Sequence, residues 1–304
     1  MSRKICISTT SFGEHDCLYL ERCRSKGFKI VLNPYGRKVS VDELIALAQD
    51  AEGLIAGTEP ITEKVLLKLP KLKVISRCGA GIENINLEVA NRLGVKLFNT
   101  PNAPTVSVAE LTIGLMLNLL RKINVMDADV KCGGWNKLMG NLLAKKNIGI
   151  IGFGRIGKKV ADLLSAFECR MVYYDPYIKD RVTNYKSVGL SELLKCSDIV
   201  CIHAATQERL LGKKELSLMK QGSFLVNVSR GEVIDEKALY VSLKNGHLSG
   251  AALDVFEKEP YNGPLKKMNN VILTPHIGSY SKEARITMER EAVDNLLKGL
   301  GEGR

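Results

Sequence analysis

The chain has 304 residues, of which 45% are hydrophobic and 6% aromatic, and its formal net charge is +11. A chain of this length and apolar content can bury a sizeable core and is long enough for two domains, which excludes a disordered protein. Lysine doublets are spread along the sequence and aromatic residues are few. We therefore expect weak attraction of small anions rather than nucleic-acid binding.

Targeting signals are not recognisable in the sequence. The N-terminal segment lacks the apolar stretch of a signal peptide. The longest apolar run, around residues 113–120, is interrupted by Gly114 and Asn118 and is too short to span a membrane. Eight cysteines are scattered without a CxxC pair, which favours reduced core thiols over a zinc site or a disulfide framework. We expect a cytoplasmic protein with no membrane association and no metal.

The first hundred residues alternate β-branched runs with helical stretches. This order is typical of parallel strands joined by helices. Residues 105–122 are then predicted to form one long helix after the breakers of residues 99–105. The expected strands are 4–9, 28–33, 53–57, 72–79 and 95–99, and the expected helices are 17–25, 41–51, 62–69 and 86–93.

The second half repeats the pattern, with apolar runs of strand length that begin at residues 147, 171, 198, 223, 248 and 270. Residues 281–300 form an amphipathic pattern that predicts a helix folded back onto the first domain. The sequence thus predicts an α/β fold with two Rossmann-like doubly wound parallel-sheet domains and a cleft between them. One domain is discontinuous, residues 1–99 plus 280–304, and the other is residues 100–279.

A glycine-rich segment, residues 152–157, lies between an apolar strand and a helix. Gly152 permits a tight turn, Gly154 lets a pyrophosphate approach the backbone, and Gly157 allows close packing of helix on strand. An acidic residue, Asp175, ends the next apolar strand, as the dinucleotide fingerprint requires. This combination predicts a dinucleotide site rather than a glycine-rich turn without a ligand.

The same segment nearly fits the phosphate loop of nucleoside triphosphatases. Lys159 occupies the position of the hydroxyl that would hold magnesium, which disfavours ATP. The carboxylate of Asp175 can accept hydrogen bonds from ribose hydroxyls but would repel a 2′-phosphate, and Pro176 and Tyr177 bring no arginine to offset that repulsion. We therefore predict NAD rather than NADP.

Polar residues follow three apolar strands of the second domain, where open α/β sheets bind ligands. They are Arg230, Glu259 and His276. Taken singly, Arg230 also suits a surface salt bridge, Glu259 a solvated loop carboxylate, and His276 a hydrogen-bonded loop histidine. Their joint placement favours a catalytic site.

These side chains suit hydride transfer between a nicotinamide and a 2-hydroxy or 2-keto acid. An arginine binds a carboxylate through two parallel hydrogen bonds and stays charged. A histidine titrates near neutral pH and can exchange a proton with the hydroxyl or keto oxygen. A neighbouring glutamate orients the imidazole and favours its protonated form. The sequence therefore predicts a dehydrogenase.

Six segments occur in the order in which one known family carries them: residues 75–86, 99–112, 149–161, 219–239, 250–260 and 273–278. Through these segments the chain resembles the D-isomer-specific 2-hydroxyacid dehydrogenases, most of all the phosphoglycerate dehydrogenase branch, over nearly its whole length. The resemblance implies that Arg230 binds substrate, that Glu259 is the partner of the histidine, and that His276 is the acid and base.

The resemblance also implies further site residues. The loop at Cys78, Gly79 and Gly81 would present backbone N–H groups to the substrate carboxylate, with Arg77 beside it. Asp254 would bind the carboxamide of the nicotinamide. The implied cofactor-binding residues are Gly152, Gly154, Arg155, Ile156, Gly157, Asp175, Thr206, Val228, Ser229, Asp254 and Gly278.

Two positions depart from the family's pattern. Residues 203–206 read His-Ala-Ala-Thr where many members have HxPxT, and Ala144 precedes Lys145 where many have glycine. Neither change removes a chemical group, so these departures concern the subfamily and leave the predicted activity as it is. The chain ends at Arg304, so we expect no C-terminal regulatory domain and no serine feedback through one.

The leading substrate expectation is 3-phosphoglycerate, with glycerate, glyoxylate or hydroxypyruvate as alternatives. The family implies a homodimer formed through the cofactor domain and the helix over residues 105–121. An alternative from another class is an NAD-sensing corepressor-like interaction protein, because relatives with this fold act in that way.

Overall fold

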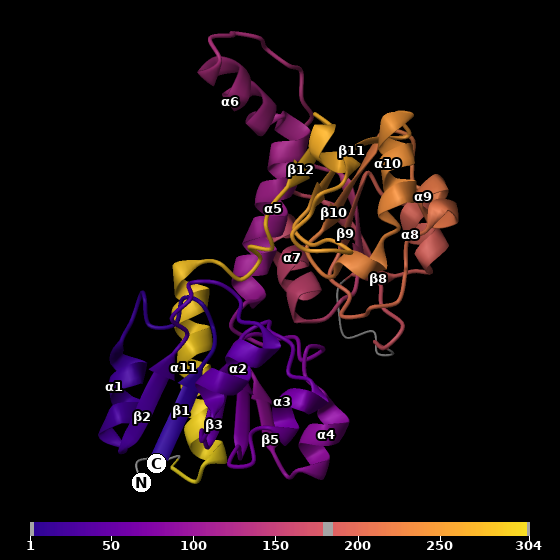
Figure 1. Ribbon diagram of the computed structural model, residues 1–304. Coiled ribbons are helices and arrows are strands. Elements are labelled where there is room, and N and C mark those ends of the chain that lie inside the picture. The colour runs from indigo at the N-terminus through magenta and orange to yellow at the C-terminus, as the bar shows by residue number, and fades with distance from the viewer. Residues whose placement is uncertain (1–2, 179–184, 303–304) are drawn as a thin grey trace. The chain divides into compact units, whose positions relative to one another are not determined.

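The computed structural model describes residues 3–178 and 185–302. The chain forms two compact units, residues 1–104 with 279–304 and residues 105–278 (Figure 1). The first boundary falls five residues later than the predicted one, at 104 instead of 99. The reason is that the segment before it stays with the first unit, where Thr100 accepts a hydrogen bond from Gly79 and Ala103 packs on the core.

The first unit contains a parallel five-stranded sheet in the order β2-β1-β3-β4-β5. Its elements are β1 (Arg3–Ile7), α1 (Leu18–Ser25), β2 (Phe28–Leu32), α2 (Val41–Ala48), β3 (Gly53–Ala56), α3 (Glu63–Leu67), β4 (Val74–Arg77), α4 (Leu87–Arg92), β5 (Lys96–Asn99) and α11 (Lys282–Gly299). Helices cover both faces of this sheet: α2, α3 and α4 contribute to one core cluster, and α1 and α11 to the other.

The C-terminal helix α11 packs against β3, β4 and β5, as its amphipathic pattern predicts (Figure 1). It begins where the Ser281 hydroxyl accepts a hydrogen bond from the Ala284 N–H, which satisfies one of the free donors of a helix start. Leu296 and Leu297 are fully buried against the sheet. The C-terminal helix of 18 residues thus completes the core of the discontinuous first domain.

The second unit contains a parallel seven-stranded sheet in the order β12-β11-β10-β9-β6-β7-β8. Its strands are β6 (Asn147–Ile151), β7 (Arg170–Tyr174), β8 (Lys186–Ser187), β9 (Ile199–Ile202), β10 (Ser223–Asn227), β11 (Leu248–Leu253) and β12 (Val271–Leu273). The central strands are apolar on both faces because helices cover both. The doubly wound parallel α/β prediction is confirmed.

Helices α5 (Thr105–Arg121) and α7 (Arg155–Ser165) pack together on one face of this sheet. Helices α8 (Leu190–Cys196), α9 (Lys213–Leu218) and α10 (Glu236–Lys244) lie on the other, with the short 3-10 turns η1 (Gly231–Val233) and η2 (Pro264–Lys267). None of the described helices has the length and apolar character of a membrane span. Five cysteines are buried as predicted, but Cys17, Cys132 and Cys196 are exposed.

The predicted long helix ends at Arg121, and a second helix that was not predicted follows it. Lys122 adopts a left-handed conformation with φ 54°, and α6 (Ile123–Lys131) starts there without a buried residue. We call residues 123–142 the arm; in Figure 1 it extends away from the rest of its unit. Trp135, Met139 and Leu142 on the arm are 79%, 90% and 70% exposed.

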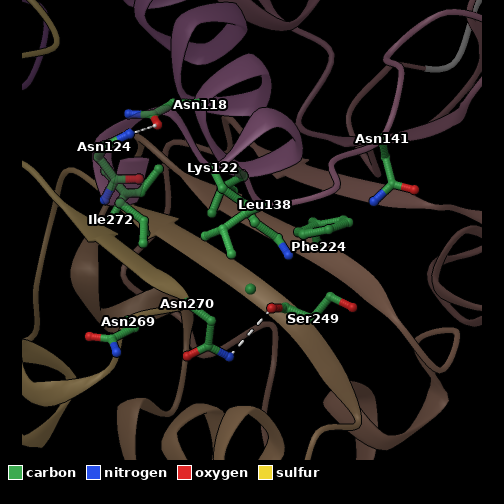
Figure 2. A pocket seen from close by; sticks show the side chains of 13 residues that line it. Asn118, Lys122, Asn124, Leu138, Asn141, Phe224, Ser249, Asn269, Asn270 and Ile272 are labelled. Carbon is green, nitrogen blue, oxygen red and sulfur yellow. Dashed lines mark hydrogen bonds between the residues drawn. The ribbon is translucent and has the colours of Figure 1, made fainter. Parts of the chain in front are cut away.

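A cavity of about 420 Å³ lies at the base of the arm (Figure 2). Leu138 covers it from the arm, and Phe224, Ser249 and Ile272 line it from β10, β11 and β12. These residues lie near the amino ends of their strands. The cavity therefore lies at the amino-end edge of the sheet. The candidate catalytic residues follow the strands at the opposite edge, where the strands have their carboxyl ends.

Candidate active site

The glycine-rich loop joins β6 to α7, and each of its glycines has a separate structural reason. Gly152 has φ +86°, and a Cβ there would lie 2.5 Å from the backbone nitrogen of Ala204. A Cβ at Gly157 would lie 2.2 Å from the carbonyl oxygen of Gly152, so the helix packs directly on the strand. A Cβ at Gly154 would meet nothing within 4 Å. Only Gly154 therefore has open space beside it, as expected where a pyrophosphate approaches.

Asp175 lies at the end of β7, beside this loop. Its Oδ2 accepts a hydrogen bond of 2.8 Å from the Phe153 N–H, and its Oδ1 accepts one of 2.9 Å from Tyr177 N–H. The ring of Phe153 is buried and stacks on Tyr173 with the centroids 4.0 Å apart, which fixes the loop in the core.

These residues fit a dinucleotide. Gly154 leaves room for phosphate, and the amino end of α7 carries N–H groups without an intrahelical acceptor and a partial positive charge. Arg155 and Ile156 occupy the first two positions of that helix. The partly exposed carboxylate of Asp175 bonds the loop at the Phe153 N–H, a position compatible with the predicted contact to ribose hydroxyls.

Three more of the predicted cofactor residues follow β9 and β10. The Thr206 hydroxyl accepts a hydrogen bond from Glu208 N–H, so it orders its own loop. Val228 and Ser229 are buried directly after β10, and Ser229 donates from both its N–H and its hydroxyl to Asn227 Oδ1.

His203 was not predicted as a site residue and lies where β9 meets the glycine loop. Its backbone packs against the position of Gly152. Both ring nitrogens are buried and have no hydrogen-bond partner among the described residues. Burial lowers the pKa of His203 to about 3, so the ring is neutral at physiological pH.

The three candidate catalytic residues follow β10, β11 and β12, which are neighbours in the sheet. Arg230 comes first, three residues after β10. The side-chain amide of Asn227, at the end of that strand, donates to the carbonyl oxygen of Arg230 at 2.8 Å. One guanidinium nitrogen of Arg230 donates to the carbonyl oxygen of Ser229 at 2.8 Å. The arginine is thus positioned by the strand that precedes it.

Glu259 and His276 are paired. His276 Nδ1 and Glu259 Oε2 lie 2.9 Å apart, and the other carboxylate oxygen of Glu259 accepts a hydrogen bond of 3.2 Å from the Phe256 N–H. The His276 side chain is 48% exposed and that of Glu259 39%, so solvent reaches both. The hydrogen bond to Glu259 raises the pKa of His276, and burial and the charge of Arg230 oppose this effect. The pair favours the protonated imidazole.

Asp254, at the end of β11, holds the loop that carries His276. Its Oδ1 accepts from the Thr274 hydroxyl at 2.6 Å and from Ile277 N–H at 2.8 Å, and its Oδ2 accepts from Gly278 N–H at 2.8 Å. His276 itself has φ 55°, a left-handed conformation that these three hydrogen bonds to Asp254 maintain. Burial raises the pKa of Asp254, although these hydrogen bonds oppose the shift.

The expected role of Asp254 in binding the nicotinamide carboxamide is thus joined by a role that the sequence did not indicate. A carboxylate offers about four acceptor positions, and the loop over residues 274–278 already uses three of them. Gly278 belongs to this hydrogen-bonded loop, and its carbonyl oxygen accepts a hydrogen bond from the Ser107 hydroxyl at 2.7 Å.

The predicted carboxylate-binding loop lies in the first unit, after β4. Cys78 N–H donates to the Ala56 carbonyl at 2.9 Å, and Gly79 N–H donates to the Thr100 hydroxyl at 2.7 Å. These two N–H groups therefore bond to the Ala56 carbonyl and the Thr100 hydroxyl instead of facing a substrate, contrary to the expectation. Gly81 remains as the predicted N–H donor. A Cβ at Gly79 would lie 1.7 Å from a guanidinium nitrogen of Arg77, so the arginine side chain lies across this glycine.

The comparisons with known proteins identify the class. The NAD-binding domain profile of the D-isomer specific 2-hydroxyacid dehydrogenases matches residues 113–278. The chain therefore belongs to this family, and the resemblance inferred from its motifs is confirmed.

Among individual relatives, the chain is 40% identical over 273 residues to the D-3-phosphoglycerate dehydrogenase of Methanocaldococcus jannaschii, covering 85% of this chain and 52% of that protein. It is 39% identical to the glyoxylate reductase of Thermofilum pendens, covering 85% and 81%. The crystal structure of the TT0316 protein of Thermus thermophilus superposes with a TM-score of 0.92 at 33% identity, over 98% of this chain and 97% of that one. The chain spans about half the length of the phosphoglycerate dehydrogenase it matches.

Proposed function

We propose that this protein transfers hydride between NAD and the carbon of a D-2-hydroxy acid or 2-keto acid. The observation that carries the proposal is the His276–Glu259 pair at 2.9 Å, on the strand ends next to that of Arg230 and in the same unit as the glycine-rich loop. Such a pair together with an arginine supplies both a proton donor and a carboxylate anchor.

Each residue then has one task. Arg230 binds the substrate carboxylate through its planar guanidinium, which stays charged at every working pH. His276 donates a proton to the keto oxygen during reduction and removes it during oxidation. Glu259 holds the imidazole through Nδ1, which leaves Nε2 for the substrate. NAD, when bound, supplies or accepts the hydride.

The substrate we propose is 3-phosphoglycerate, with 3-phosphohydroxypyruvate as its keto acid. The chain carries a net charge of +11. This charge suits an acid with an additional phosphate. A glyoxylate or hydroxypyruvate reductase is the alternative, and the names of the relatives divide between these activities. Eight free thiols suit a reducing compartment, so we propose the cytoplasm.

Oxidation of NADH with a panel of 2-keto acids tests this function. We expect turnover with at least one acid, fastest with 3-phosphohydroxypyruvate. Arg230→Ala should lower kcat/KM by roughly a hundredfold, because a charged hydrogen bond is worth up to about 3 kcal/mol. Arg170→Ala, an exposed arginine of the same unit, should leave the rate unchanged. Normal NADH binding without turnover of any acid would favour the corepressor-like interaction protein.

We also propose that the protein is a homodimer formed through α5 and the arm. The arm carries Trp135, Met139 and Leu142 in solvent, and no residue of α6 is buried. Apolar side chains that gather on one projecting segment are typical of an interface. Light scattering should give twice the chain mass of 33.5 kDa for the wild type and one chain mass for a Trp135→Ser, Met139→Ser double variant. A monomeric wild type would contradict the proposal.

A further inference from the structure

We propose that Glu236 is a positioning residue that holds the Glu259 segment against the Arg230 segment; this inference rests on the function proposed above. Glu236 is not among the residues that the sequence indicated, and it lies outside the His276–Glu259 pair. Its role follows from the contacts between the loops that follow β10 and β11.

A direct hydrogen bond links the two loops. The backbone N–H of Glu257, two residues before Glu259, donates to Glu236 Oε1 at 2.8 Å. Glu236 is the first residue of α10, and Asp235 caps that helix by accepting from Lys237 N–H and Ala238 N–H at 3.0 Å. The acceptor is therefore fixed on a capped helix end, and it meets the backbone of the segment that carries the histidine's partner.

The two loops also touch through their backbones. A Cβ at Gly231, the residue after Arg230, would lie 1.9 Å from the carbonyl carbon of Phe256 and 2.4 Å from the nitrogen of Glu257. Only glycine allows this approach. Backbone contact at Gly231 thus limits how closely the Arg230 and Glu259 segments approach, and the hydrogen bond to Glu236 holds them at that spacing.

A third link is weaker. Arg209 reaches Glu257 at 3.0 Å and Asp235 at 3.7 Å, so it bridges the same two loops. Its side chain is 54% exposed, and exposed ion pairs contribute little. Glu236, by contrast, is partly buried: burial raises its pKa, as does the charge of Glu257, while the Glu257 N–H opposes the shift. The hydrogen bond from the Glu257 N–H offsets the cost of burying the Glu236 carboxylate, which explains why a carboxylate is found there.

Displacement of this segment has a defined consequence for His276. The Phe256 N–H donates to one oxygen of Glu259 and His276 bonds the other. The charged groups that face His276 are Glu259, Asp254 and Arg230, whereas Glu236 faces Glu257 and Tyr261. Loss of Glu236 therefore acts on His276 through the position of Glu259. A loosened Glu259 lowers the pKa of His276 toward its ordinary value.

The test compares Glu236→Ala, which removes the acceptor, with Glu236→Gln, which removes the charge and keeps an acceptor oxygen. Lys237→Ala, on the next and exposed position of α10, is the matched control. The four histidines of the chain can be followed by NMR in the substrate-free protein, with His276→Ala for assignment. Thermal unfolding confirms that each variant is folded.

For Glu236→Ala we expect a lower titration midpoint of His276 and a kcat reduced about tenfold or more, because small misplacements of catalytic groups are costly. KM and the Kd for NADH should change less than twofold. Glu236→Gln and Lys237→Ala should resemble the wild type. An unchanged His276 midpoint in Glu236→Ala, or a Gln variant as impaired as the Ala variant, overturns the proposal. A lowered midpoint in a protein without turnover of any keto acid would support the positioning role and contradict the dehydrogenase.

Discussion

His276 Nδ1 lies 2.9 Å from Glu259 Oε2, so the protonated imidazole and the carboxylate form an ion pair. This contact is the main reason why the pKa of His276 is raised. Under the proposed function, reduction of a keto acid needs the protonated imidazole, so we expect its rate to fall as the pH rises through the pKa of His276. The pair should therefore extend the proposed reduction to higher pH.

Glu259→Gln should move this pH dependence. Gln keeps a hydrogen-bond acceptor but removes the charge, so the pKa of His276 falls and kcat/KM for reduction declines at a lower pH than in the wild type. Oxidation, which needs the neutral imidazole, should persist to lower pH. Profiles of kcat/KM against pH in both directions measure the effect, with exposed Lys258→Ala as the control. Coinciding profiles for Gln and wild type would remove Glu259 from its assigned role.

Gly154 and Gly157 should respond to alanine in opposite ways. A Cβ at Gly157 would lie 2.2 Å from the Gly152 carbonyl, so Gly157→Ala should destabilise the unit by about 1–3 kcal/mol or more. Gly154→Ala meets nothing within 4 Å and should unfold like the wild type. It should still weaken NADH binding roughly tenfold, about 1.4 kcal/mol, because the methyl group occupies the approach of the pyrophosphate.

Urea unfolding and NADH fluorescence titration separate these two effects, and each glycine serves as the control of the other. An undiminished affinity for NADH in Gly154→Ala would mean that the dinucleotide binds elsewhere. An undiminished stability in Gly157→Ala would mean that helix α7 does not pack on β6 as closely as described.

The parallel α/β fold and the glycine-rich loop could be predicted because they depend on local patterns. Apolar runs such as residues 147–151 end in a polar or glycine residue at the carboxyl edge of the sheet, and parallel pairing then brings distant residues together. Arg230, Glu259 and His276 follow three such runs. Their meeting at neighbouring strand ends follows from strand order, which the motifs suggested through the family resemblance.

The parts that could not be predicted depend on tertiary contacts. The left-handed Lys122 ends α5 although its sequence pattern continues. Asp254 bonds the His276 loop through side-chain oxygens whose direction no pattern reveals. The N–H groups of Cys78 and Gly79 were expected to face a ligand, but Ala56 and Thr100 accept them. A motif identifies a residue type at a position and leaves its hydrogen-bond partners open.

Asp175 should determine the choice between NAD and NADP. Asp175→Asn keeps an acceptor for the Phe153 N–H but removes the charge that repels a 2′-phosphate. The ratio of the Kd values for NADPH and NADH should fall at least about fivefold, since two like charges near a protein surface repel by roughly 1 kcal/mol or more. Fluorescence titration with both cofactors measures the ratio, and exposed Asp162→Asn on α7 is the control. A ratio equal to that of the wild type would show that another group rejects NADP.

His203 should make the protein sensitive to mild acid. Its pKa is about 3 in the folded state because burial disfavours the charged ring, and about 6.5 in the unfolded chain. Between these values the unfolded state binds the additional proton, so stability is lost as the pH falls below about 6.5. The loss grows by up to about 1.4 kcal/mol per pH unit, which gives about 2 kcal/mol between pH 7.5 and pH 5.

His203→Leu should abolish this part of the pH dependence. Neither ring nitrogen has a partner among the described residues, so an apolar side chain of similar size leaves no hydrogen bond unmade and should retain the stability of the wild type at pH 7.5. Urea unfolding at pH 7.5 and pH 5 measures the difference, and His15→Gln, at an exposed position, should behave as the wild type does. If wild type and His203→Leu lose the same stability on acidification, His203 is already protonated or solvated in the folded protein, and the acid sensitivity arises from another group.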